Sequence, residues 1–152
     1  MHGDQPLPER SELQKNLDQV FKEAMLSDHF IYAEVAVIDR SPLGRRNELV
    51  NEMYPASRGE LSTKPKGLNL IVPDIETISW RVMKEWGSAD RATAARVSAA
   101  ISTTLASAKG EYFVITGPQH DRPCQGTYWS RWLLSVDRVA GRCIGLSVAA
   151  SD

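Results

Sequence analysis

The chain has 152 residues, of which 42% are hydrophobic and 24% are charged, and its formal net charge at pH 7 is -1. This length fits one domain with its own hydrophobic core, without a need for disulfides or a structural metal. The small net charge excludes a field of one sign over the whole protein. No apolar run reaches the roughly 20 residues that span a membrane, so we expect no membrane contact.

The start of the chain is polar and contains prolines, so we expect a flexible lead-in over 1–10 and a single domain over 11–150. The lead-in lacks the apolar core of a secretory signal, which favours a cytoplasmic protein. The two cysteines are Cys124 and Cys143, and reduced thiols fit that compartment better than a disulfide framework.

Residues 11–26 show the hydrophobic periodicity of an amphipathic helix. Apolar side chains recur every three or four positions along one face: Leu13, Leu17, Val20, Phe21 and Ala24. Ser11 followed by Gln14 fits a capping box at the start of this helix.

Residues 30–39 are rich in β-branched and aromatic side chains and predict a strand. Because side chains alternate across a strand, Ala33 and Val35 share the face that we expect to point toward the core. Phe30 and Tyr32 then lie on the opposite face, which is a candidate contact surface.

Residues 40–67 predict a long irregular loop, because turn-forming residues interrupt every periodic pattern. The loop is locally basic, and its cationic residues outnumber its glutamates: Arg40, Arg45, Arg46, Arg58, Lys64 and Lys66. Loops of more than about 15 residues are uncommon in compact domains and usually serve a function. The loop is therefore a candidate binding region.

Residues 68–72 predict a short strand that ends at Pro73, followed by a helix with Asp74 as its N-cap. The turn formers at 87–88 separate this helix from a second one over 89–108. The second helix is rich in small residues and has one apolar stripe: Ala94, Val97, Ile101, Leu105 and Ala108.

The last third of the chain predicts three strands, at 111–116, 127–138 and 142–150, with Gly141 in a tight hairpin between the last two. The expected core face of the middle one is Tyr128, Trp132, Leu134 and Val136. Consecutive strands with short links pair antiparallel. We therefore predict an α+β single domain with a mostly antiparallel sheet of about five strands, and with the N-terminal helix and a central helix pair on one face.

One loop holds residue types used in nucleophilic catalysis: His120, Asp121 and Cys124. A cysteine nucleophile needs a base within hydrogen-bonding reach and a third group that orients the base. Such triads usually come from distant parts of a chain, so a small Cys/His hydrolase is an alternative rather than the leading hypothesis. The familiar zinc and nucleotide motifs are absent, and we expect no metal and no cofactor.

The strand over 127–138 places Trp129 and Arg131 on one face. Aromatic and arginine side chains on an open sheet face can stack the bases of single-stranded RNA, and Arg45 with Arg46 could contact phosphates. RNA binding is therefore a second alternative. The slightly negative net charge argues against it.

The leading hypothesis is a non-enzymatic protein-interaction or assembly module, which is either a homodimer or bound to another protein. Leu133 shares the face of Trp129, and with Tyr32 these side chains would form an exposed apolar patch if all helices cover the other face. Such patches mark interfaces more often than active sites. The basic residues of 40–67, among them Arg58, would add to this surface.

The closing stretch WSRWLLSVDRVAGRCIGLSVAASD, residues 129–152, is similar in style to the last hairpin of PAS-type sensor domains. The resemblance implies a ligand-sensing domain as a third alternative. The irregular segment 40–67 departs from it, because a PAS core has a tight strand pair in that part, and the resemblance assigns no site residue.

Overall fold

The computed structural model describes residues 7–24, 30–54, 62–85, 91–116 and 127–151. Within these residues the chain forms its helices and strands in the following order: α1 (Arg10–Ala24), β1 (Phe30–Asp39), α2 (Arg46–Met53), β2 (Ser62–Lys66), α3 (Leu68–Glu85), α4 (Arg91–Leu105), β3 (Glu111–Thr116), β4 (Thr127–Asp137) and β5 (Arg142–Ser151).

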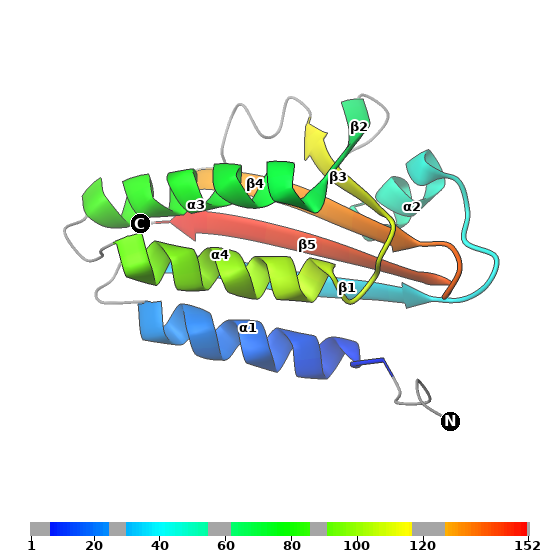
Figure 1. Cartoon of the computed structure of the whole chain (residues 1–152), viewed down its shortest axis with the longest axis horizontal. Helices are drawn as coiled ribbons and strands as arrows, with labels where there is room; N and C mark the ends of the chain where they lie inside the picture. The colour runs from blue at the N-terminus through cyan, green and yellow to red at the C-terminus, as the bar shows by residue number, and fades with distance from the viewer. Residues whose placement is uncertain (1–6, 25–29, 55–61, 86–90, 117–126, 152) are drawn as a thin grey trace.

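These strands form one sheet in the order β1-β5-β4-β3-β2, and every neighbouring pair is antiparallel. The first and last strands of the sequence are thereby paired, with Val35 opposite Leu146. α1, α4 and α3 lie side by side across one face of the sheet (Figure 1). The arrangement confirms the predicted α+β fold, with an antiparallel sheet and with the N-terminal helix and the central helix pair on one face.

The main hydrophobic core lies between this helical layer and the sheet. Its buried side chains come from both layers: Leu13, Leu17, Phe21, Ala33, Val35, Ile71, Ile75, Ala94, Val97, Ile101, Leu105, Ala108, Leu133, Ile144, Leu146 and Val148. Leu13, Leu17 and Phe21 of the stripe predicted for α1 are confirmed as buried, as is every member of the stripe predicted for the second central helix. Val20 is partly buried against the same core, and the side chain of Ala24 lies outside the described residues. α4 lies between α1 and α3 (Figure 1), where small residues allow close packing of helices.

The opposite face of the sheet carries a second hydrophobic cluster beneath α2. Its buried members are Ile38, Leu43, Leu49, Val50, Phe113, Ile115, Leu134, Val136 and Cys143. The prediction of an irregular loop over 40–67 was therefore wrong for α2 and β2. Leu49 and Val50 attach α2 to the sheet, and so short a helix depends on this packing rather than on its own periodicity.

The segment 68–72 was predicted as a strand, but it begins α3. Ile71 and Ile75 are both 1% exposed and lie four residues apart, on one helical face toward the main core. Pro73 lies inside the helix, and the expected N-cap Asp74 is an exposed helical residue. A short apolar run does not distinguish a strand from a helix until its packing partners are known.

α1 closes part of the outer edge of β1, which is an edge strand. The predicted capping box is wrong, because Ser11 lies within the first turn of α1 and Gln14 reaches the strand instead. The Gln14 side-chain amide donates to the Ala33 carbonyl and accepts from the Val35 N–H, both at 2.8 Å. Gln14 thereby takes the place of a neighbouring strand and protects this edge from pairing with another chain.

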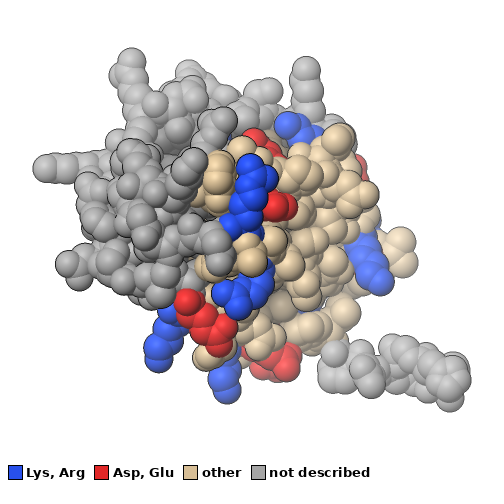
Figure 2. Space-filling view, turned by 60° about the vertical axis from the view of Figure 1, so that its left-hand side comes forward, with Lys and Arg blue, Asp and Glu red and all other residues tan. Residues whose placement is uncertain are grey.

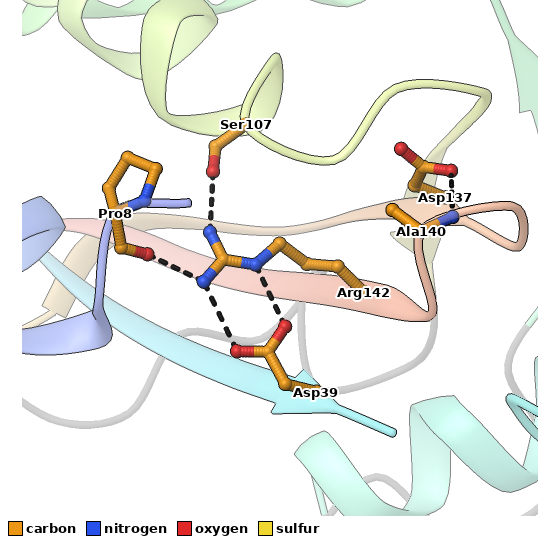
Figure 3. Close-up of polar contacts among 6 residues, drawn as sticks. All are labelled: Pro8, Asp39, Ser107, Asp137, Ala140 and Arg142. Carbon is orange, nitrogen blue, oxygen red and sulfur yellow. Dashed lines mark hydrogen bonds and ion pairs between the residues drawn. The ribbon is translucent and has the colours of Figure 1, made fainter. Parts of the chain in front are cut away.

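A buried arginine at the start of β5 joins four segments of the chain (Figure 3). The Arg142 side chain is 2% exposed and donates two hydrogen bonds to the Asp39 carboxylate of β1, at 2.9 and 3.1 Å. It also donates to the Ser107 hydroxyl after α4, at 2.8 Å, and to the Pro8 carbonyl before α1, at 2.6 Å. Gly141, the residue before it, has a φ of 70°, as the predicted hairpin requires.

Candidate interaction surface

The predicted site residues that the structure describes do not lie together in one place. Four of them lie outside the described residues: Arg58, His120, Asp121 and Cys124. Trp129 belongs to β4 and Tyr32 to β1, but their side chains are likewise outside the description. Arg131 is a partly buried residue of β4. Arg45 and Arg46 are the two predicted residues that lie together, at the start of α2.

Leu133 was predicted on an exposed face and is instead 0% exposed, in the main core. Its neighbour Leu134 is also 0% exposed, in the second cluster on the opposite face. β4 is therefore covered on both sides at this point, by the helical layer and by α2. Adjacent apolar residues in a strand are typical of burial on both faces, so the sequence contained a signal against the patch.

The C-terminal end of α2 is attached to the sheet through Tyr54. Its ring stacks on Trp132 of β4, with the ring centroids 4.7 Å apart, and its hydroxyl donates to the Leu133 carbonyl at 3.0 Å. Burial raises the pKa of the Tyr54 phenol, so this donor keeps its proton. An added Cβ at Gly145 of β5 would lie 2.9 Å from the Met53 sulfur and 3.0 Å from the Tyr54 hydroxyl oxygen. The missing side chain at Gly145 therefore makes room for α2.

The N-terminal end of α2 forms an open pocket with β3. The pocket has a volume of about 240 Å³ and is lined by Arg45, Arg46, Asn47, Glu111 and Phe113. The Arg46 guanidinium lies over the Phe113 ring, 5.8 Å from its centroid. Arg45 is the N-cap residue and forms no side-chain capping bond. The N–H groups of the first helical turn therefore add to the positive potential at this end.

The glutamate of this pocket has a basic partner, whereas its arginines have no acidic partner among the described residues. Arg138 forms an ion pair with Glu111 at 3.3 Å and donates to the Gly44 carbonyl at 3.0 Å. The Arg46 Nε atom is buried and has no hydrogen-bond acceptor within the described part of the chain. Arg45 is exposed. The pocket therefore holds positive charge that the described residues do not neutralise.

The positive charge of the pocket does not reflect an overall basic composition. In the view of Figure 2, the lysines and arginines of the described residues are interspersed with aspartates and glutamates. The chain as a whole has 18 basic and 19 acidic residues. The described residues on the side shown in Figure 2 therefore form no continuous basic surface of the kind that nucleic acid requires.

The Cys143 thiol lies in the second cluster and is 0% exposed. Burial raises the pKa of this thiol to about 12, which favours the protonated thiol over the reactive thiolate at neutral pH. Within the described ranges, no three His, Cys, Asp or Glu side chains lie together in a way that could hold a metal ion. None of the described helices is both long and apolar enough to cross a membrane.

These features define a small α+β module: an antiparallel sheet with α1, α3 and α4 on one face and α2 on the other. Two crystal structures of citrus MAF1 share this fold, with TM-scores of 0.53 and 0.57 at sequence identities of 12% and 13%. Each match covers 91% of this chain and 98% of the MAF1 chain. No protein-family model matches the sequence, and no curated protein is significantly similar to it. At this identity the likeness shows the architecture alone.

Proposed function

We propose that this chain is a non-enzymatic protein-interaction module that binds a partner protein through α2 and the pocket at its N-terminal end. The surface lies in the basic segment 40–67, which the sequence marks as a candidate binding region. It takes the place of the apolar sheet patch, because Leu133 is buried. The observation that carries the proposal is the pocket in which Arg45 and Arg46 lack acidic partners among the described residues.

α2 is suited to present a binding surface because packing against the sheet holds it in place. Leu49 and Val50 are 0% and 2% exposed, and the residue after the helix, Tyr54, bonds to β4. The residues Asn47 and Asn51 are exposed and polar, as is common at the rim of a protein interface. A surface that is already ordered loses little conformational entropy when a partner binds.

Site-specific photo-crosslinking in extracts of the native cells tests this surface. Benzoylphenylalanine replaces Asn47 on α2 and, as the matched control, Ala95 on the exposed side of α4. We expect a discrete protein adduct from Asn47→benzoylphenylalanine that unlabelled wild-type chain competes away, and no such adduct from the α4 position. Equal yields from both positions, or adducts with nucleic acid alone, would contradict the proposal.

The partner in this proposal can be a second copy of the same chain, in which case the protein forms a homodimer. Size-exclusion chromatography with light scattering at two protein concentrations measures it directly. A mass that rises with concentration toward twice 16.9 kDa supports a homodimer. A constant mass of 16.9 kDa excludes the homodimer and leaves a different protein as the partner.

A further inference from the structure

We propose that the pocket at the start of α2 binds the carboxylate of a glutamate or aspartate side chain in an acidic segment of the partner protein. This inference rests on the proposed function and specifies the chemistry of the partner. Its basis is the charge balance of the pocket, together with the apolar ring at its base.

The charge balance of the pocket leaves the two arginine charges without an acidic partner among the described residues. Arg45 and Arg46 are two cations, and the one anion among the lining residues, Glu111, is already paired with Arg138 at 3.3 Å. A carboxylate that lies between the two guanidinium groups can accept hydrogen bonds from both, with one oxygen for each arginine.

The Phe113 ring supports the Arg46 guanidinium at the pocket. Phe113 is 2% exposed, and the guanidinium of Arg46 lies 5.8 Å from the centre of its ring. A guanidinium stacked on an aromatic ring still presents its planar edge of donors, which matches the two oxygens of a carboxylate.

A phosphoryl group matches the pocket less well than a carboxylate. It carries a charge of about -1.5 to -2 at pH 7 and would lie beside Glu111 as well as beside the arginines. Nucleic acid binds through many phosphates in succession, whereas the chain as a whole has 18 basic and 19 acidic residues. Glu111 therefore repels a phosphoryl group more strongly than a carboxylate, which favours a carboxylate on a protein segment.

NMR titration of the ¹⁵N-labelled full chain distinguishes these ligands. The probe is a capped peptide with glutamates on both sides of a phenylalanine, and the control peptide has glutamine in place of each glutamate. We expect the glutamate peptide to shift the backbone amides of Asn47 and Phe113 with saturation, and to bind at least about tenfold more tightly than the glutamine peptide. The double variant Arg45→Gln, Arg46→Gln should lose saturation, whereas Arg96→Gln, an exposed arginine of α4, should not.

Glu111→Gln provides a second variant whose expected effect is a gain rather than a loss, so a folding defect cannot imitate it. Removing this negative charge, and with it the pairing of Arg138, should tighten binding of the glutamate peptide severalfold. Equal binding of the two peptides, or no gain from Glu111→Gln, would overturn the carboxylate assignment. Tighter saturable binding of a phosphoserine peptide or of oligothymidylate at the same amides would also overturn it. In each of these cases an adduct from the Asn47 position would still support the interaction module, while loss of that adduct would contradict the proposed function itself.

Discussion

The ion pair of Arg142 with Asp39 tests how the helical layer is joined to the sheet. The Arg142 side chain is 2% exposed, whereas that of Asp39 is 56% exposed. Asp39→Ala therefore leaves the buried charge behind. In that variant the guanidinium keeps its bonds to Ser107 and Pro8 but loses both bonds to a carboxylate.

The expected loss in the free energy of unfolding depends on which of the two charges remains after the substitution. Hydrogen bonds to charged groups contribute about 1.5–3 kcal/mol each, and leaving a buried charge without its partner costs about 3–5 kcal/mol. Because water reaches the Asp39 end of the pair, we expect Asp39→Ala to lower the free energy of unfolding by about 3 kcal/mol. Arg142→Met leaves a carboxylate that water solvates, and we expect a smaller loss of about 2 kcal/mol.

Urea unfolding followed by circular dichroism measures these losses, with the free energy taken by linear extrapolation. The double variant should lose clearly less than the sum of the single variants, because both remove the same interaction. Glu52→Gln is the matched control, since it breaks the ion pair with Arg40 in which both side chains are about half exposed, and its midpoint should stay near that of the wild type. A smaller loss for Asp39→Ala than for Arg142→Met, or additive losses in the double variant, would refute the reasoning.

Three further predictions concern α2, the edge of β1 and the buried thiol. Gly145→Val should displace the Tyr54 ring from its stack on Trp132 and lower the free energy of unfolding by about 1–3 kcal/mol. The near-ultraviolet circular dichroism spectrum should change as well, and an unchanged spectrum would show that a valine side chain fits beneath α2. Gln14→Ala should cost about 1–3 kcal/mol and promote self-association through β1, and light scattering that shows a monomer at high concentration would argue against edge protection. In Cys124→Ser protein, Cys143 should react with a thiol reagent at pH 8 only after unfolding, because burial raises its pKa to about 12. An unfolded thiol ionises near pH 8.5, so the stability due to this burial is present below about pH 8.5 and is lost as the pH rises toward 12. If the urea midpoints of the proteins with Cys143 and with Cys143→Ala changed by the same amount over this pH range, the result would contradict this prediction.

The candidate site was predictable in part. The sequence identified 40–67 as a basic segment of interest, and Arg45 with Arg46 as binding candidates. It did not reveal the pocket, because the opposite wall comes from Glu111 and Phe113 on β3, far away in the sequence. The local sequence pattern does not show which distant strand a short helix will contact. It also does not show that Arg138 will form an ion pair with Glu111.

The sequence by itself determined the elements whose signals are local. Each member of the stripe from Ala94 to Leu105 on α4, and Ala108 just after it, is buried as predicted, and the hairpin glycine Gly141 has the expected positive φ. These succeed because helical periodicity and turn conformation depend on residues within a few positions of each other.

Only the tertiary structure decided which surfaces are covered. Leu133 became core rather than interface because the sheet is covered on both faces at β4. The segment 68–72 became helix because Ile71 and Ile75 pack together against the main core, and α2 formed because the second face of the sheet buries Leu49. In each case the free energy comes from apolar area that is buried against residues distant in the chain, and a short local pattern carries no information about those partners.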